Sequence, residues 1–287
     1  MFETILFPTD GSDEADRALE VVLNIAAAHD ATIHVLSVAD TNARSVAASD
    51  SGLIDVLAED CERVVRDAGE QARSRDISVI ETAVRGEPYS TITEYAADHG
   101  IDLIAMSTRG RGAFGRFILG SVATKVIRTT DVPVLSIRPE AMVAYPFDDV
   151  LVATDGSTSA KAGLNEAVGL AAAETATLHA VSVVELGRYG PDAHASLNIE
   201  TFEQRAEDAV SAARRVGAKA DVDTQTIVEY GEVHAKILQS IESSDADIVV
   251  LATHGRTVFD RYLLGSISER VVRTSQIPAP TDREAKA

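Results

Sequence analysis

The sequence predicts an α/β protein built from two tandem, doubly wound domains, each with a five-stranded parallel sheet. One observation is a duplication, because Ile5–Ser12 (ILFPTDGS) returns as Val150–Ser157 (VLVATDGS). The offset is constant at 145 residues, as 155 − 10 for the aspartates and 265 − 120 for the glycines both show. A second observation is that short apolar segments alternate with longer amphipathic ones, which is typical of parallel strands covered by helices on both faces. Both copies therefore have the same expected architecture.

The first copy opens on a short apolar strand, Thr4–Pro8. Ser12–His29 follows as an amphipathic helix, and Ser12 and Asp13 at its start are the candidates for capping it. Thr32–Val38 is rich in β-branched residues, which favour a second strand. The pattern then predicts a helix over Ser51–Arg75 and a third strand over Ser78–Val84.

The rest of the copy continues the alternation. Gly86-Glu87-Pro88 opens a third helix, because proline fits a first helical turn. Asp102–Met106 is almost wholly apolar and is the expected fourth strand. A glycine-rich loop then leads into a helix from about Leu119 to Thr129, and Val134–Ile137 is the fifth strand.

The second copy departs from this pattern at its end. Pro278–Arg283 (PAPTDR) stands where the first copy has Pro133–Arg138 (PVLSIR). Pro280 and Asp282 interrupt the apolar run that a strand needs. We expect this degenerate last strand to be missing or to lie at an irregular edge.

Each copy is long enough to bury a core of its own. The expected domains are residues 1–139 and 148–287, joined by a linker at 140–147. A single cysteine, Cys61, cannot form an internal disulfide, and no Cys/His cluster has the spacing of a zinc site, so no metal site is expected. His34 and His179 occupy equivalent places on second strands and are expected to be structural.

The composition is strongly acidic, with 45 acidic and 26 basic residues and a net charge of −19. Only five of the basic residues are lysines, and the acids are dispersed, which together indicate a halophilic origin in which surface charge maintains solubility. A clustered acidic patch for a basic partner is not seen. Nucleic-acid binding is not expected without a basic stripe. Without an apolar run of roughly 20 residues or a signal-peptide pattern, we expect a cytoplasmic protein and no membrane contact.

Two features of each copy predict a ligand crevice. Asp10 follows the first strand and a glycine-rich loop follows the fourth, and doubly wound sheets bind ligands beyond such strand ends. Gly110 and Gly120 allow backbone amides to approach an anion closely. Ser121 begins a helix, whose dipole favours negative charge. The aspartate only accepts hydrogen bonds, which suits a ribose hydroxyl or a base amine.

The charges along this loop point the same way. From Arg109 to Arg128 there are five basic residues and no acidic one. This favours anion binding, although each arginine alone is also explained by a solvated helix face. In the second copy His254 stands in place of Arg109, as a phosphate contact or as a solvent-facing loop residue.

The same residues resemble the nucleotide signature of the universal stress protein family, Gly-x2-Gly-x9-Gly-Ser/Thr, downstream of a first strand that ends in Asp. The two copies read Ser107-x2-Gly110-x9-Gly120-Ser121 and Ala252-x2-Gly255-x9-Gly265-Ser266. The chain is thus similar to a tandem universal stress protein over nearly its whole length.

The resemblance implies a Rossmann-like domain with strand order 3-2-1-4-5 in each copy. It implies that Asp10 and Asp155 contact adenosine, that Val38 and Val183 hold adenine through their backbone, and that the glycine–serine loop holds ribose and phosphates. The expected nucleotide-binding residues are Pro8, Thr9, Asp10, Val38, Ser107, Arg109, Gly110, Gly120 and Ser121 in the first copy, and Thr154, Asp155, Val183, Ala252, His254, Gly255, Gly265 and Ser266 in the second.

Both copies lack the first glycine of the signature and have Ser107 and Ala252 there. If that position requires a positive φ, the substitution costs about 1–3 kcal/mol. If the glycine only permits a close approach, a small residue suffices. We favour the second interpretation because both substituents are small.

The expected function is that of a stress-response protein that binds ATP or another adenine nucleotide in each copy, together with Mg²⁺, and acts as a sensor or regulator. At most weak ATP hydrolysis is expected, because the Gly-x4-Gly-Lys-Ser/Thr loop is absent. The alternative is a pseudo-symmetric scaffold that binds no nucleotide and acts through protein partners. An adenylating enzyme is a third and poorer match, since Asp10-Gly11-Ser12 departs from its pyrophosphate loop. The copies are expected to pack as a pseudo-dimer, or two chains to form a homodimer.

Overall fold

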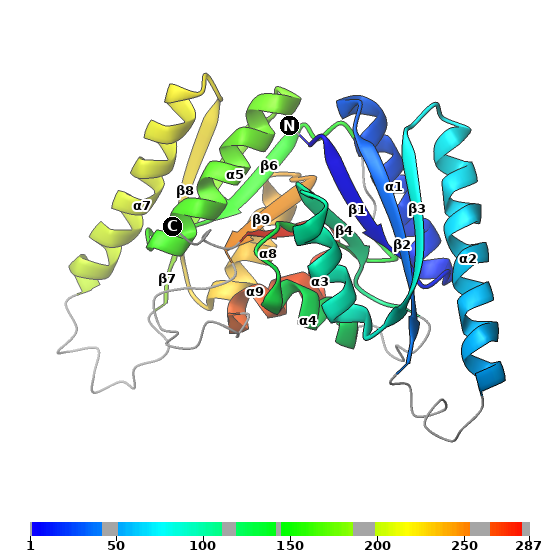
Figure 1. Cartoon of the computed structure of the whole chain (residues 1–287). Coiled ribbons are helices and arrows are strands. Elements are labelled where there is room, and N and C mark those ends of the chain that lie inside the picture. The colour runs from blue at the N-terminus through cyan, green and yellow to red at the C-terminus, as the bar shows by residue number, and fades with distance from the viewer. Residues whose placement is uncertain are drawn as a thin grey trace. The chain divides into compact units, whose positions relative to one another are not determined.

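The computed structural model of the 287-residue chain describes residues 2–41, 51–110, 119–141, 145–185, 199–252 and 265–282 (Figure 1). The chain divides into two compact units, residues 1–141 and 142–287. None of the helices within the described ranges is both long enough and apolar enough to cross a membrane.

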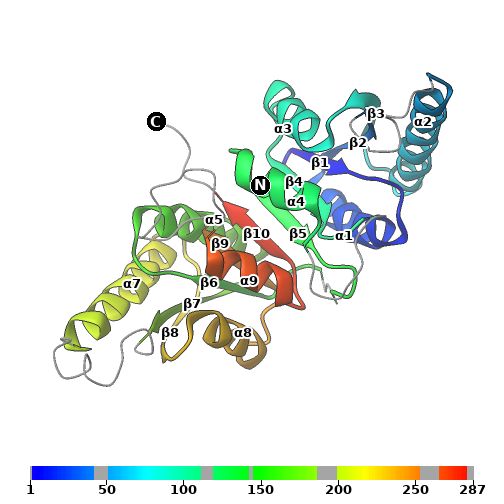
Figure 2. The same cartoon turned by 90° about the horizontal axis from the view of Figure 1, so that it is seen from below.

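The first unit is a parallel sheet with helices on both faces. Its strands are β1 (Thr4–Pro8), β2 (Thr32–Asp40), β3 (Val79–Gly86), β4 (Leu103–Ser107) and β5 (Val134–Ile137). Its helices are α1 (Asp13–His29), α2 (Ser51–Arg73), α3 (Pro88–Asp98) and α4 (Ser121–Thr129). The strand order β3-β2-β1-β4-β5 confirms the order that the family resemblance implies. Helices α1 and α2 cover one face of the sheet, and α3 and α4 cover the other (Figure 2).

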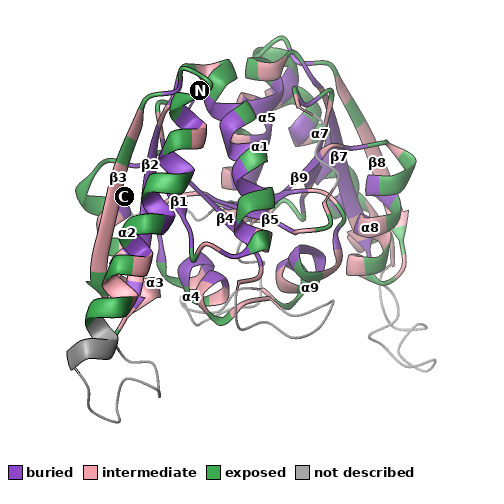
Figure 3. Cartoon of the chain, turned by 90° about the vertical axis from the view of Figure 1, so that its right-hand side faces the viewer, coloured by how far each residue is buried: buried purple, intermediate pink, exposed green. Residues whose placement is uncertain are grey.

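The core of this unit is the centre of the sheet. Ile5 pairs with Ile33 of β2 on one side and with Leu103 of β4 on the other, so β1 is the central strand. Every residue of β4 is buried, as both faces of a parallel sheet require (Figure 3). The Asp102 carboxylate accepts hydrogen bonds from the amides of Glu3 and Thr4 at 3.0 and 2.9 Å, which fixes the start of β1 beside β4.

The second unit repeats this architecture. Its strands are β6 (Asp149–Ala153), β7 (Thr177–Val184), β8 (Thr224–Tyr230), β9 (Ile248–Ala252) and β10 (Ala279–Asp282). Its helices are α5 (Thr158–Glu174), α7 (Ile199–Lys219), α8 (Val233–Ser243) and α9 (Ser266–Thr274). The order β8-β7-β6-β9-β10 is the same winding. Asp247 likewise accepts hydrogen bonds from the amides of Asp148 and Asp149, at 2.8 and 3.1 Å.

The sequence left the last strand of the second unit either missing or at an irregular edge, and β10 fits the second alternative within its unit. It pairs in parallel with β9 through two residue pairs, Thr281 with Leu251 and its neighbour with Ala252, where β4 and β5 share four. Within its unit it lies at the end of the strand order, where prolines are most often found in sheets. Although Pro278 has no amide hydrogen to donate, its carbonyl accepts a hydrogen bond from the amide of Val249 at 3.1 Å. The apolar run is lost, yet these backbone groups still pair.

Candidate functional site

A cavity of about 500 Å³ opens in the first unit beyond the carboxyl ends of β1, β2 and β4. Its volume lies in the range of small-molecule sites. Its lining includes all nine residues that the sequence assigns to the first copy: Pro8, Thr9, Asp10, Val38, Ser107, Arg109, Gly110, Gly120 and Ser121. The fold thus brings the expected residues together, and their roles toward a ligand stay predictions.

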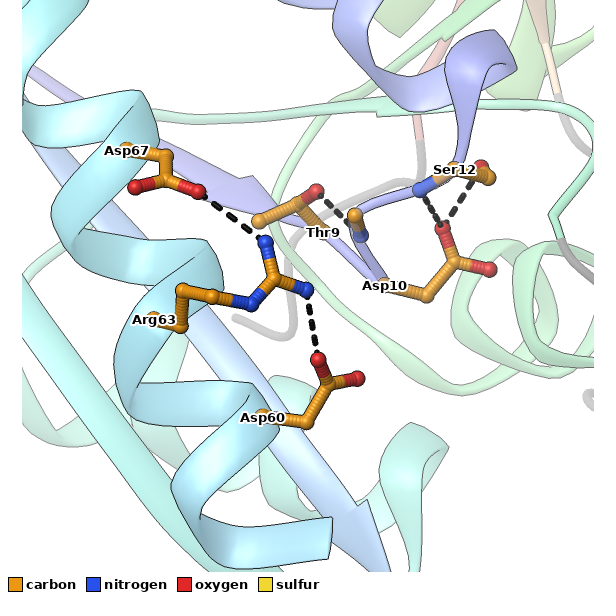
Figure 4. Close-up of polar contacts among 7 residues, drawn as sticks. Thr9, Asp10, Ser12, Asp60, Arg63 and Asp67 are labelled. Atoms are coloured by element: carbon orange, nitrogen blue, oxygen red, sulfur yellow. Dashed lines mark hydrogen bonds and ion pairs between the residues drawn. The ribbon is translucent and has the colours of Figure 1, made fainter.

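The turn between β1 and α1 fixes the orientation of Asp10. Its Oδ1 accepts hydrogen bonds from the amide and the hydroxyl of Ser12, at 3.1 and 2.7 Å (Figure 4). Thr9 Oγ1 accepts one from the amide of Gly11 at 3.1 Å, and Gly11 has φ 67°, a conformation that favours glycine. Ser12 is the N-cap of α1, as predicted, because its Oγ accepts a hydrogen bond from the amide of Ala15 at 3.3 Å.

The carboxylate of Asp10 lies directly against Gly110. A Cβ added at Gly110 would clash with Oδ2 and would lie 3.2 Å from Cγ of Asp10. Because β1 and β4 are neighbours in the sheet, the turn after β1 meets the loop after β4 at this point. The two predicted features therefore face each other across the point where the strand order reverses.

The start of α4 is open toward the cavity. Gly120 has extended backbone (φ −56°, ψ 147°) and is an N-cap without a side-chain hydrogen bond, so α4 begins two residues after the predicted start. The Gly120 amide donates to the carbonyl of Thr108 at 2.7 Å, and a Cβ there would lie 3.1 Å from that oxygen. The close approach of the Thr108 carbonyl to the Gly120 backbone therefore explains why a glycine stands at this position. The following residues Ser121, Val122 and Ala123 line the cavity, and first-turn amides are the donors that an anion uses at a helix N-terminus.

Ser107 stands where the family signature has its first glycine. It is the last residue of β4, its exposed fraction is 8%, and it is not among the residues with positive φ, nor is Ala252. Its hydroxyl accepts a hydrogen bond from the amide of Arg109 at 3.3 Å. A small side chain is therefore accommodated without backbone strain, which is the interpretation that the sequence favoured.

One wall of the cavity is apolar, and this wall was missed in the sequence analysis. The lining residues not foreseen are Ala15, Leu36, Pro88, Ile92, Met106, Thr108, Leu119, Val122 and Ala123. Thr108, Val122 and Ala123 adjoin motif residues and could have been inferred from that proximity. Leu36 and Ile92 reach the cavity through the packing of α3 on β2, which no local pattern reveals. An apolar wall suits the flat face of a heterocyclic base.

Arg109 is the cation of the described lining, and it is already paired. Its guanidinium forms an ion pair with the carboxylate of Glu140, which follows β5, and the same carboxylate lies 3.5 Å from Arg138. The hydrogen bond from Arg109, with the charges of both arginines, lowers the pKa of Glu140 against the opposing effect of burial. Glu140 is therefore held in its ionised form.

A further cation, Arg63 on α2, is engaged by carboxylates of its own helix. Its guanidinium lies 2.5 Å from Asp60 and 3.1 Å from Asp67 (Figure 4). These contacts, led by the hydrogen bond to Asp60, raise the pKa of Arg63. Arg63 is not part of the cavity lining.

The second unit repeats the turn after its first strand. Asp155 Oδ1 accepts a hydrogen bond from the amide of Ser157 at 2.9 Å, and Thr154 Oγ1 accepts one from the amide of Gly156 at 3.2 Å. Gly156 has φ 74°, matching its counterpart in the first unit. The hydrogen bond from the amide two residues on and the positive φ of the glycine are therefore common to both copies.

The other predicted residues of this copy are only partly described. Gly265 is the N-cap of α9 with extended backbone and no side-chain hydrogen bond, and Ser266 is the first helical residue. Val183 lies in β7, and Ala252 ends β9. His254 and Gly255 lie outside the described residues.

Comparison with known proteins assigns the chain to a family. The family model of the universal stress proteins matches residues 1–138 and 146–279. The chain belongs to the universal stress protein family. Because the match occurs twice, it is a tandem universal stress protein.

The relatives of this universal stress protein include both full-length and single-repeat matches. A universal stress protein of Mycolicibacterium smegmatis is 28% identical over 290 residues, covering 96% of this chain and 95% of the relative. One of Methanocaldococcus jannaschii is 28% identical over 141 residues, covering 48% of this chain and 83% of the relative. A solved universal stress protein of Archaeoglobus fulgidus matches with a TM-score of 0.76 and 25% identity over 98% of each chain.

The described part of this universal stress protein holds no group of three or more His, Cys, Asp or Glu side chains that could bind a metal ion. The described residues that line the first-unit cavity instead supply hydrogen-bond donors, one cation, one carboxylate and an apolar wall. This set is suited to binding a ligand that combines a polar, anionic part with a flat apolar part.

Proposed function

We propose that this universal stress protein binds ATP or another adenine nucleotide in the first-unit cavity and acts in the cytoplasm as a sensor or regulator of a stress response. The observation that supports this most is the position of Asp10 against Gly110, on a cavity that the start of α4 also lines. A carboxylate that accepts hydrogen bonds from hydroxyl groups and a set of amides that donate hydrogen bonds to an anion then lie around one cavity of about 500 Å³.

Each part of the nucleotide has a matching set of residues. Asp10 is oriented by Ser12 and accepts hydrogen bonds from the ribose. The first-turn amides of α4 and the Ser121 hydroxyl donate to phosphate oxygens. Adenine packs against the apolar wall, with the backbone of Val38 as its polar partner.

The expected affinity is modest. Three or four charge-assisted hydrogen bonds of roughly 1.5–3 kcal/mol each, less the cost of association, correspond to about micromolar binding. Mg²⁺ enters with the nucleotide, since it is usually held by substrate phosphates and few protein ligands. We propose a role through a shift between conformations rather than dedicated catalysis.

We propose a second site in the second unit on the same grounds. The turn at Asp155 repeats the turn at Asp10, and Gly265 starts α9 as Gly120 starts α4. One difference lies at Ser268, the counterpart of Ala123 (268 − 145), whose hydroxyl donates to the carbonyl of Ala252 at 2.7 Å. The two sites are therefore expected to differ in affinity.

Calorimetric titration with Mg-ATP at about 1 M salt tests the proposal, because such salt screens the repulsion between ATP and a chain of net charge −19. We expect two sites per chain, the tighter near micromolar. Asp10→Asn, which keeps the acceptor for Ser12 and replaces the second carboxylate oxygen with a donor, should weaken one site by roughly tenfold, or 1.4 kcal/mol.

Asp155→Asn is the matched variant and should weaken the other site. If the wild type shows one site per chain and Asp155→Asn leaves its affinity unchanged, binding is restricted to the first unit. If millimolar Mg-ATP gives no heat and displaces no competing adenine nucleotide, the proposed function is wrong and the scaffold alternative is favoured.

A further inference from the structure

Arg109, the cation of the described cavity lining, forms an ion pair with a carboxylate of the same chain. Arg109 follows β4 and Glu140 follows β5, and these strands are paired from Ile104 to Ser107. The loops that leave them therefore lie together. The Arg109 side chain is only 12% exposed, whereas Glu140 is 44% exposed at the outer side of the ion pair.

This carboxylate has the chemistry of a phosphate. Both groups offer oxygens to the planar donors of a guanidinium, and both prefer the same two-point geometry. Asp10 is the other charged residue of the described lining and is an acceptor, so Arg109 is the side chain there that can form an ion pair with a phosphate. An incoming phosphate and Glu140 therefore require the same donors.

The surroundings of Glu140 make an exchange feasible. Arg138 lies 3.5 Å from the same carboxylate and is itself only 10% exposed. If Glu140 leaves Arg109, its charge still has Arg138 within reach, and its half-exposed carboxylate also remains in contact with water. The ion pair can thus move from one arginine to the other.

We propose that Glu140 is an intramolecular competitor for the phosphates of a ligand in the first-unit cavity and so determines how strongly that cavity favours phosphorylated over unphosphorylated ligands. This inference rests on the proposed function. Binding of a phosphate exchanges the Arg109–carboxylate pair for an Arg109–phosphate pair and transfers Glu140 to Arg138. A nucleoside without phosphate binds without this exchange.

The test compares Mg-ATP with adenosine on the full chain at one ionic strength and one Mg²⁺ concentration. Glu140→Gln keeps the size of the side chain and removes its charge. We expect it to strengthen Mg-ATP binding by roughly tenfold, equivalent to 1.4 kcal/mol, and to leave adenosine binding unchanged. In an Arg109→Gln background, Glu140→Gln should no longer strengthen Mg-ATP binding, because the contested donor is gone.

Glu87→Gln is the matched control. Glu87 is also a half-exposed carboxylate of the first unit, 38% exposed and 3.3 Å from Lys125, and it does not line the cavity. The Glu87→Gln substitution removes one negative charge, as Glu140→Gln does. It therefore measures how far the loss of any negative charge strengthens Mg-ATP binding by reducing electrostatic repulsion. An equal gain in Glu87→Gln, an equal gain for adenosine, or no gain in Glu140→Gln would overturn the inference. If wild type binds neither ligand, the proposed function itself fails, which is a separate outcome.

Discussion

Asp10 and Gly110 are 100 positions apart in the sequence (110 − 10), and each constrains the other. The turn after β1 uses Oδ1 of Asp10 for two hydrogen bonds to Ser12, which leaves Oδ2 facing the loop after β4. A residue without a side chain is required opposite, since a Cβ would meet that oxygen. The glycine is thus explained by its neighbour rather than by its own φ, which is not positive.

We predict that Gly110→Ala weakens Mg-ATP binding by at least about tenfold, or 1.4 kcal/mol, because the new methyl group displaces the Asp10 carboxylate or the loop. Titration calorimetry measures this. Gly69→Ala is the control, because its Cβ meets the side chain of Glu81, which does not line the cavity. Unchanged affinity in Gly110→Ala would contradict the role given to this contact.

The residues of the first-unit cavity were predictable where they follow strand ends. Asp10, Gly110 and Gly120 could be foreseen because the carboxyl ends of parallel strands meet at one edge of a sheet. Ile92 of the cavity lining, and Glu140, which follows β5 and pairs with Arg109, were not foreseen. One arrives through the packing of a helix, and the other through the pairing of β4 with β5, and neither adjoins the motif in sequence.

At the scale of elements, the packing of α3 on β2 is organised around a buried histidine. His34 of β2 is 6% exposed, and its Nδ1 lies 3.0 Å from the hydroxyl of Tyr95 on α3. His99 stacks on the Tyr95 ring with centroids 3.8 Å apart. Burial lowers the pKa of His34, and the nearby His99 lowers it further. These contacts fit the structural role expected for this histidine.

We predict that the unfolding free energy falls as the pH drops below about 6.5, the ordinary pKa of histidine. The pKa of His34 is lower in the folded chain, so the unfolded chain binds more protons in this window and gains stability relative to the folded one. His34→Gln, which keeps a polar group, should flatten this dependence. Urea unfolding at about pH 7.5 and 5.5 measures it, and an equally steep fall in the variant would contradict the assignment.

Elements were predictable from the hydrophobic pattern except at the end of the second unit, where backbone pairing and small buried side chains form a strand. The sequence at the end of the second unit resembles a broken strand because Pro280 and Asp282 interrupt the apolar run. β10 forms nonetheless, because Thr281 pairs with Leu251 and the carbonyl of Pro278 accepts from Val249. The hydrophobic pattern of the sequence does not predict such backbone pairing.

At the scale of the whole molecule, charge is the dominant property. The chain carries 45 acidic and 26 basic residues. Several of the basic side chains are paired locally, as Arg63 is with Asp60 and Asp67, so the excess acids are left to repel one another. Such self-repulsion destabilises the compact state at low ionic strength. This part of the behaviour follows from composition and does not require the fold.

We predict that the midpoint of thermal unfolding rises between about 0.1 and 1 M NaCl, as the screening length falls from about 10 to 3 Å. KCl at the same ionic strength is the control and should give a similar rise, since screening depends on ionic strength rather than on the cation. A midpoint that falls with salt would show that local ion pairs outweigh the net repulsion.

The ordinary backbone at Ser107 and Ala252 has a consequence for how such crevices arise. A small residue such as serine or alanine can end the fourth strand, because this position does not require a positive φ. What this turn does require is a residue without a side chain opposite Asp10, at Gly110. A sequence signature that requires glycine as its first residue is therefore stricter than the backbone conformation at this position demands.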